Sequence, residues 1–106
     1  MKGITAMTEE IEKYEPLYAL KDPINFDGDL VSELTLNLEA LMASDIDKAE
    51  QIFNAKKYKA PVMEMSKKYN IIVAHLSCDY PIEFFDQLSA RDYQRIYLKV
   101  MGFLNA

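Results

Sequence analysis

The chain has 106 residues, of which half are hydrophobic and eleven per cent are aromatic, and its formal net charge is -5. This length suits one domain with a substantial core, and the composition argues against a chain that is disordered throughout. The negative charge disfavours nucleic acid as a partner, because phosphate binding needs a concentrated basic face. A single cysteine excludes an internal disulfide and is typical of a protein from a reducing compartment.

Neither a membrane span nor a leader is expected. No apolar run approaches the roughly 20 residues that a membrane-spanning helix needs. Glu9, Glu10 and Glu12 fall where a signal peptide would have its apolar stretch. We therefore expect a soluble protein of the cytoplasm with no membrane partner. Residues 1–16 show weak periodicity and mixed charge, so we expect a flexible N-terminal segment there and a single domain at residues 17–106.

A β-hairpin is predicted at the start of this domain. Asp27-Gly28 suits a two-residue hairpin turn, since both central residues must adopt positive φ and these residue types tolerate it. Leu34 and Leu36 alternate with polar residues, which is typical of a strand with one buried face. Pro23 lacks an amide hydrogen and therefore predicts an interruption or an outer edge in the first strand.

Two helices are predicted in the middle of the chain. Ser44 followed by Asp47 forms a Ser-x-x-Asp start, so we expect Ser44 to be the N-cap of a helix that ends near Lys56. Pro61 is expected to begin a longer helix that ends near Cys78, because the apolar residues after it are spaced three and four apart.

The last predicted elements are a short helix after Pro81 and a longer terminal helix after Ser89. The Ser89 hydroxyl can accept a hydrogen bond from the amide three residues later, and the charge of Asp92 favours a helix start. The terminal helix has an apolar face that we expect to meet the core, made of Tyr93, Ile96, Tyr97, Val100 and Leu104. The predicted fold class is therefore α+β, an N-terminal β-hairpin packed with three or four α-helices.

Other apolar side chains of the terminal helix lie at the edges of that face or beyond it. They are Leu98, Met101 and Phe103. Apolar residues left beside water suit a protein that covers an apolar partner helix, so these three form the predicted partner-binding surface. The alternative, that the hairpin or the N-terminal segment covers them, is equally compatible with the pattern. Met63 and Met65 could join Met101 in an adaptable surface, although core filling is the default for a methionine.

Candidate catalytic and metal-binding residues are few. His75 and Cys78 are three apart on one predicted helix, where an imidazole could lower the pKa of a thiol. No third orienting group is apparent, so we favour a partly buried cysteine beside a histidine. One cysteine and one histidine are too few for a structural zinc site, and Asp27-Gly-Asp29 is better explained as a turn than as a calcium loop. We therefore expect no enzyme, no metal and no cofactor.

Lysines are mixed with a tyrosine in two short runs, at residues 56–59 and 67–69. Such runs could contact RNA or an acidic partner. Solvated helix ends are the favoured interpretation, given the negative charge of the whole chain.

The order of these features resembles the phage tail assembly chaperone family, small proteins encoded near the tape measure genes of tailed phages and prophages. The resemblance runs from Tyr18 to Leu104 and rests, in chain order, on Leu20, Pro23-Ile24, Gly28, Glu33-Leu-Thr-Leu36, Asp45, Leu88-Ser-Ala-Arg-Asp92 and Phe103-Leu104. Asn37 stands where the family pattern often has a basic residue. That departure puts in doubt any partner contact made through a basic side chain there.

The resemblance implies a non-enzymatic protein that binds the tape measure protein in the host cytoplasm, with the tail tube protein as a second candidate partner. Members of the family are thought to coat the long hydrophobic tape measure protein before the tail tube forms around it, and they are often made in two lengths by frameshifting. The competing interpretation is a small bacterial cytoplasmic adaptor or regulatory protein that acts by protein–protein binding. A thiol hydrolase that uses Cys78 and His75 is the third interpretation and the least favoured one.

Overall fold

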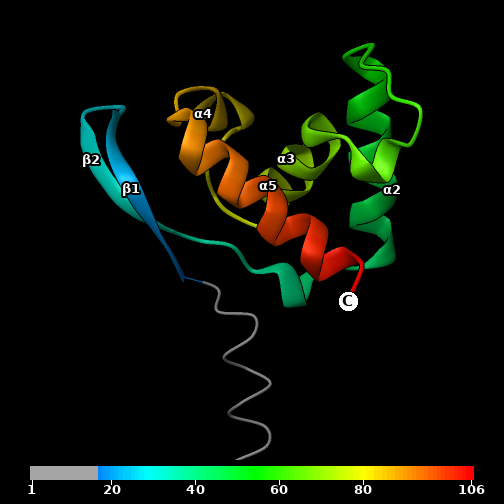
Figure 1. Ribbon diagram of the computed structural model, residues 1–106, viewed down its shortest axis with the longest axis horizontal. Helices are drawn as coiled ribbons and strands as arrows, with labels where there is room; N and C mark the ends of the chain where they lie inside the picture. Colours follow the sequence, from blue (N-terminus) through cyan, green and yellow to red (C-terminus); the bar gives the residue numbers. More distant parts are fainter. Residues whose placement is uncertain (1–16) are drawn as a thin grey trace, which may run out of the picture.

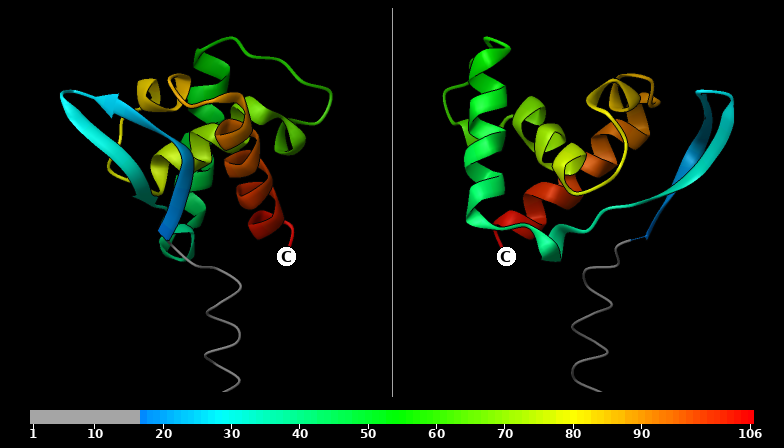
Figure 2. Two further views of the ribbon diagram at one scale, coloured as in Figure 1. Left: turned by 60° about the vertical axis from the view of Figure 1, so that its left-hand side comes forward. Right: turned by 180° about the vertical axis from the view of Figure 1, so that it is seen from behind.

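The computed structural model describes residues 17–106, which fold into a β-hairpin followed by four α-helices and two short 3₁₀ helices. The predicted α+β class is confirmed, whereas the expected flexible segment at residues 1–16 lies outside the described residues. The elements are β1 (Leu17–Phe26), β2 (Asp29–Thr35), η1 (Leu38–Ala40), α2 (Ala43–Ala55), η2 (Met63–Met65), α3 (Lys67–Leu76), α4 (Ile82–Asp86) and α5 (Ala90–Leu104). The hairpin stands on one side of the helices and α2 on the other, with α3 and α5 between them (Figures 1 and 2).

The hairpin turns at the predicted dipeptide. Asp27 and Gly28 have φ angles of 52° and 86°, the positive values that this turn requires. The antiparallel pairing is irregular: Ala19 pairs with Glu33 and Ile24 with Val31, so residues 20–23 of β1 face only Ser32 of β2. This bulge contains Pro23 and confirms the expected interruption of the first strand.

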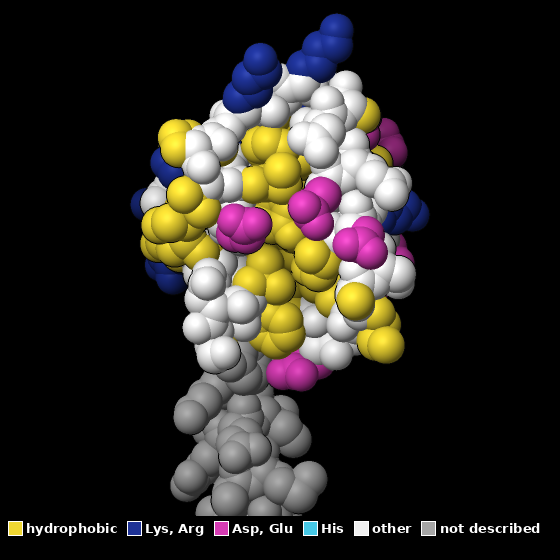
Figure 3. Space-filling view, turned by 90° about the vertical axis from the view of Figure 1, so that its right-hand side faces the viewer, with side chains coloured by type: hydrophobic (Ala, Val, Ile, Leu, Met, Phe, Trp, Pro, Cys, Tyr) yellow, Lys and Arg dark blue, Asp and Glu magenta, His cyan; other side chains and the backbone are white. Residues whose placement is uncertain are grey.

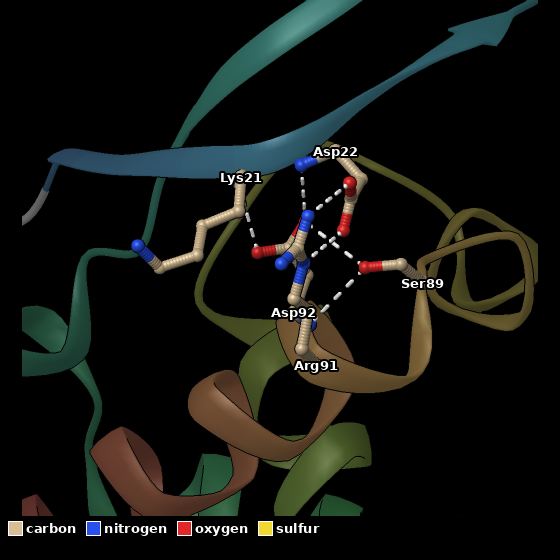
Figure 4. A network of polar contacts seen from close by, with 5 residues as sticks. All are labelled: Lys21, Asp22, Ser89, Arg91 and Asp92. Atoms are coloured by element: carbon tan, nitrogen blue, oxygen red, sulfur yellow. Dashed lines mark hydrogen bonds and ion pairs between the residues drawn. The ribbon is translucent and has the colours of Figure 1, made fainter.

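The bulge releases two backbone amides from the hairpin ladder. Lys21 N donates to Asp92 Oδ1 at 3.0 Å, and Asp22 N donates to Asp92 Oδ2 at 2.9 Å (Figure 4). The Asp92 side chain is fully buried in the first turn of α5. One carboxylate therefore joins the hairpin to a helix about 70 positions later in the chain.

Ser89 is the N-cap of α5, as predicted. Its Oγ accepts a hydrogen bond from Asp92 N and donates one to Asp92 Oδ2, both at 3.3 Å. Beside this cap, Arg91 donates from two nitrogens to the Asp22 carboxylate, at 2.7 and 2.8 Å. The hydrogen bonds from Arg91 hold the pKa of Asp22 well below its usual range. The corner between β1 and α5 is thus closed by both buried and exposed contacts.

Helix α3 forms the centre of the core, and α2 and α5 each pack against it. Residues 69–74 are all buried, which is expected of a helix surrounded by other elements. Asn70 is the fully buried polar residue among them, and its Nδ2 donates to the carbonyls of Glu64 at 2.9 Å and Ser66 at 2.8 Å. The side chain therefore fixes η2 against the start of α3.

The prediction that Ser44 caps α2 is wrong. The helix begins at Ala43 with Met42 as the N-cap, and the Asp45 carboxylate accepts a hydrogen bond from Met42 N at 2.8 Å. Asp45 lies three residues after the N-cap, where an acidic side chain can reach back to this amide. The carboxylate, not the serine hydroxyl, therefore defines the helix start.

The prediction that Pro61 begins a long helix is also wrong. The 3₁₀ helix η2 follows Pro61, and α3 begins only at Lys67, after the extended Ser66. The Asn70 amide binds the carbonyls of Glu64 and Ser66 across this break, which supplies them with a donor outside a regular helix.

Helix α5 buries its apolar face, although the centre of that face differs from the prediction. Ile96 and Val100 are fully buried and Tyr97 nearly so, while Tyr93 and Leu104 are only half-buried. The most buried stripe of α5 runs through Asp92, Ile96 and Val100, which are spaced four residues apart. The sequence analysis places the charge of Asp92 at the helix start and does not predict that its side chain is buried.

Replacing the buried carboxylate tests its role in the fold. We expect Asp92→Asn to lower the free energy of unfolding by about 2–3 kcal/mol, because the amide NH₂ cannot accept a hydrogen bond and leaves a buried backbone amide unpaired. Urea denaturation measures this loss. Arg91→Ala is the control, since it removes only an exposed ion pair and should cost less. Equal losses for the two variants would contradict the assignment.

A second pair of variants tests the helix caps. Ser89→Ala should cost about 1 kcal/mol, as is typical for the loss of an N-cap hydroxyl. Ser44→Ala should change stability by less than about 0.5 kcal/mol, because Ser44 is exposed and no cap hydrogen bond depends on it. Thermal unfolding of both variants provides the comparison, and a larger loss for Ser44→Ala would reverse the assignment.

Candidate partner-binding surface

The three residues predicted to form the partner-binding surface lie in different surroundings on α5. Leu98 is 49% exposed, whereas Met101 and Phe103 are half-buried and pack against the core. Leu98 is therefore the member that offers apolar area to a partner most directly. Met101 and Phe103 extend that area toward the end of the helix while contributing to the packing beneath it.

A second exposed apolar segment lies beside α5. Val62 is 49% exposed and Met65 is 60% exposed. The Tyr97 hydroxyl donates to the Met65 carbonyl at 2.9 Å, which holds this segment against α5. Val62 and Met65, with residues 59–61 and Ser66, line a shallow hollow of about 350 Å³. Sequence reasoning missed Val62, because it placed the residue on the buried face of a helix that does not form there.

The lysine–tyrosine runs have a structural role. Lys68 Nζ lies 5.5 Å from the ring centroid of Tyr58 and 5.9 Å from that of Tyr93, and Lys67 Nζ lies 5.9 Å from that of Tyr97. A cation over an aromatic face is attracted to it, so Lys68 links the segment after α2 to the first turns of α5. These contacts favour the interpretation of the two runs as helix-end residues over their interpretation as an RNA-binding site.

Cys78 and His75 do not form a nucleophile–base pair. The Cys78 thiol donates to the His75 backbone carbonyl at 3.6 Å, and His75 Nδ1 lies 2.8 Å from the Tyr80 carbonyl. Because a carbonyl only accepts, Nδ1 carries the proton in this contact. Burial raises the pKa of the Cys78 thiol, the opposite of what a thiolate nucleophile needs.

Alkylation of the single cysteine tests this arrangement. We expect iodoacetamide to modify Cys78 more slowly in the folded protein than in urea, because the buried thiol has a smaller thiolate fraction near neutral pH than a free cysteine. Mass spectrometry over a time course gives both rates. Faster modification of the folded protein would indicate an activated thiol. The variant Cys78→Ser should retain partner binding.

No group of three or more His, Cys, Asp and Glu side chains within residues 17–106 could hold a metal ion. None of the described helices is long and apolar enough to cross a membrane.

The comparison with known families identifies the family of this chain. The family model described as phage tail assembly chaperone proteins, E, or 41 or 14, matches residues 17–105. The chain belongs to this family. No curated protein and no solved structure matched the chain. The match covers every helix and strand described above, so the whole fold of this family member lies within it.

The residues that carried the resemblance hold the fold of this tail assembly chaperone together. Gly28 forms the hairpin turn, and Asp45 accepts a hydrogen bond from the amide of Met42, the N-cap of α2. The segment Leu88–Asp92 supplies the N-cap of α5 and the carboxylate that binds the hairpin. These positions therefore report the family fold. Phe103 also carried the resemblance, and it belongs to the predicted partner-binding surface. Asn37, the departure from the pattern, is exposed, and its backbone amide donates to the Ser77 carbonyl at 2.8 Å.

Proposed function

We propose that this protein is a phage or prophage tail assembly chaperone that binds the tape measure protein during tail assembly in the host cytoplasm, without catalysis. Membership of the tail assembly chaperone family carries the proposal. It favours this function over the bacterial adaptor or regulatory protein that the sequence alone left open. The tail tube protein is the second candidate partner.

The surface proposed for binding the tape measure protein is the outer part of α5, formed by Leu98, Met101 and Phe103. A long apolar helix aggregates unless its surface is covered, and another helix can cover it through an exposed apolar face. Leu98 supplies such a position at 49% exposure. Met65 extends the apolar area on the neighbouring segment, since its carbonyl is bound by Tyr97 of α5.

The absence of catalysis in this proposal is supported by the contacts of Cys78 and His75. The thiol and the imidazole each bind a backbone carbonyl, and burial raises the pKa of the thiol. An acyl-transfer mechanism needs a thiol whose pKa is lowered and which binds an imidazole nitrogen, whereas the Cys78 thiol binds the backbone carbonyl of His75.

Co-expression with the tape measure protein tests the proposed surface. We expect Leu98→Glu with Met101→Glu to lose most of the co-purified partner, since a charge at the centre of an apolar interface costs about 2 kcal/mol or more. Leu30→Glu is the matched control, because Leu30 is 70% exposed on the hairpin and lies outside the proposed surface. Circular dichroism verifies that each variant is folded.

Each outcome of this experiment has a distinct meaning. A folded double variant that binds as well as the parent would exclude this face of α5. An unfolded double variant would show that Met101 is essential to the core, and Leu98→Glu alone then gives the answer, because Leu98 is exposed. If the unaltered protein does not co-purify with the tape measure protein, the proposed partner itself is wrong.

A further inference from the structure

The segment that joins α2 to α3 concentrates basic charge on a chain whose formal net charge is -5. Residues 56–68 contain one acidic residue, Glu64, and five exposed lysines, at positions 56, 57, 59, 67 and 68. Figure 3 shows basic side chains at the upper end of the side that carries α2, the end at which α2 finishes in Figure 1. The ion pair found within residues 17–106 joins Arg91 to Asp22, so the five lysines carry charge that no carboxylate of this part of the chain pairs with.

A shallow hollow of about 350 Å³ lies within this segment. Its lining consists of Lys59, Ala60, Pro61, Val62, Met65 and Ser66. Val62 is 49% exposed and Met65 is 60% exposed, so both offer apolar area to a partner. Lys59 is exposed at the same hollow, whereas Glu64, the acidic residue of the segment, is not part of the lining. Apolar area and positive charge therefore meet at one place on the surface.

Hydrogen bonds from α3 and α5 hold the backbone of the hollow in place. The Tyr97 hydroxyl of α5 donates to the Met65 carbonyl at 2.9 Å. Asn70 Nδ2 of α3 donates to the carbonyls of Glu64 at 2.9 Å and Ser66 at 2.8 Å. The consecutive carbonyls of residues 64–66 are thus all bound by side chains of the two helices. A preformed site loses less entropy on binding than one that must first be ordered.

A second lysine stands beside the hollow on the side of α5. Lys67 Nζ lies 5.9 Å from the Tyr97 ring centroid, and the hydroxyl of the same ring binds the Met65 carbonyl. Tyr97 therefore places Lys67 near Met65, while Lys59 lines the hollow itself. An apolar side chain that enters the hollow would bring its neighbours in the partner close to both lysines. Negative charge on those neighbours would be attracted, and positive charge would be repelled.

We propose that this basic-rimmed hollow, defined by Lys59, Val62, Met65 and Lys67, binds an amphipathic helix of a partner protein whose apolar face is flanked by aspartate or glutamate. Charge complementarity selects this partner, because a helix with lysine or arginine at its edges would be repelled there. The proposal rests on the proposed function, since Tyr97 of α5 joins Met65 to the surface proposed above. It names the charge pattern of the helix that this surface covers.

A nucleic acid is disfavoured as the occupant by the same contacts. Single-stranded nucleic acids bind by stacking bases on aromatic rings that lie beside basic groups. The rings of Tyr58, Tyr93 and Tyr97 each already face a lysine of this chain. The lining of the hollow contains no aromatic side chain, so it suits an apolar side chain of a protein helix better than a base.

Synthetic peptides test the charge pattern without the tape measure protein. Two peptides of about 18 residues share one leucine-rich helical face, and the positions that flank it are Glu in one and Lys in the other. Isothermal titration with the full chain should detect binding of the Glu peptide, with binding of the Lys peptide at least about fivefold weaker. Raising the salt from about 50 to about 500 mM should weaken the binding of the Glu peptide, because exposed charge pairs are screened.

Charge reversal on the protein locates the binding site. Lys59→Glu with Lys67→Glu should weaken the binding of the Glu peptide at least about fivefold and strengthen that of the Lys peptide. Both lysines are exposed, and Lys67 begins α3, where a glutamate is favourable, so the variant should fold. The matched control, Lys21→Glu with Lys48→Glu, makes the same change in net charge at exposed residues outside the hollow and should change neither affinity by more than about twofold. Circular dichroism confirms folding, and Lys59→Glu alone decides if the double variant unfolds.

A second pair of substitutions tests the apolar part of the hollow. Val62→Ser with Met65→Ser should weaken the binding of both peptides, because it removes apolar area that both would cover. Leu17→Ser with Leu30→Ser is the control, since these two leucines are exposed on the hairpin. The charge variant shifts the two peptides in opposite directions and the apolar variant shifts them in the same direction, so the two contributions are separable.

Several results would overturn the proposal. They are equal binding of the two peptides, no binding of either, or an equal effect of the hollow and control variants. A short RNA that binds where neither peptide does would assign the lysines to nucleic acid instead. In sedimentation of the protein alone, a dimer that the double charge reversal breaks would assign the hollow to a second copy of this chain.

Failure here and failure of the proposed function have different signatures. If the tape measure protein co-purifies but the two peptides bind equally, the chaperone function stands and the charge pattern is wrong. If the Glu peptide binds at the hollow but the tape measure protein does not co-purify, the hollow takes an acidic-edged helix from another protein and the proposed partner is wrong.

Discussion

The Asp92 carboxylate is the contact on which the arrangement of hairpin and helices depends. A buried carboxylate is costly unless its oxygens accept hydrogen bonds. Here Lys21 and Asp22 supply two backbone amides, and the Ser89 hydroxyl supplies a third donor. The two amides are available only because the bulge withdraws residues 20–23 from the hairpin ladder. Bulge, buried charge and helix cap therefore form one unit, and removal of any member leaves polar groups of the others without partners.

A second, apolar contact holds the tip of the hairpin and explains why a two-stranded sheet persists beside the helices. The Phe26 ring lies edge-on to Phe84, with centroids 5.3 Å apart, and Tyr80 stacks on Phe84 at 4.2 Å. An isolated hairpin is at best marginally stable in water. This one is held by the Asp92 hydrogen bonds at the bulge and by aromatic packing near the turn, so its inner face becomes part of the core around α3.

The sequence predicted the features that are encoded within a few residues and missed those that depend on distant partners. The positive φ values at Asp27-Gly28 and the Ser89 cap are local, and the fold class follows from them together with the apolar periodicity. The role of Asp92 required knowledge of two amides about 70 positions away. Pro61 and Ser44 are assigned to helix starts from residue type and spacing. In the structure Asp45 accepts the Met42 amide at the start of α2, and the Asn70 side chain binds two carbonyls at the break before α3. For the binding surface, helical phase placed Leu98 outside the core, but it could not reveal the exposure of Val62.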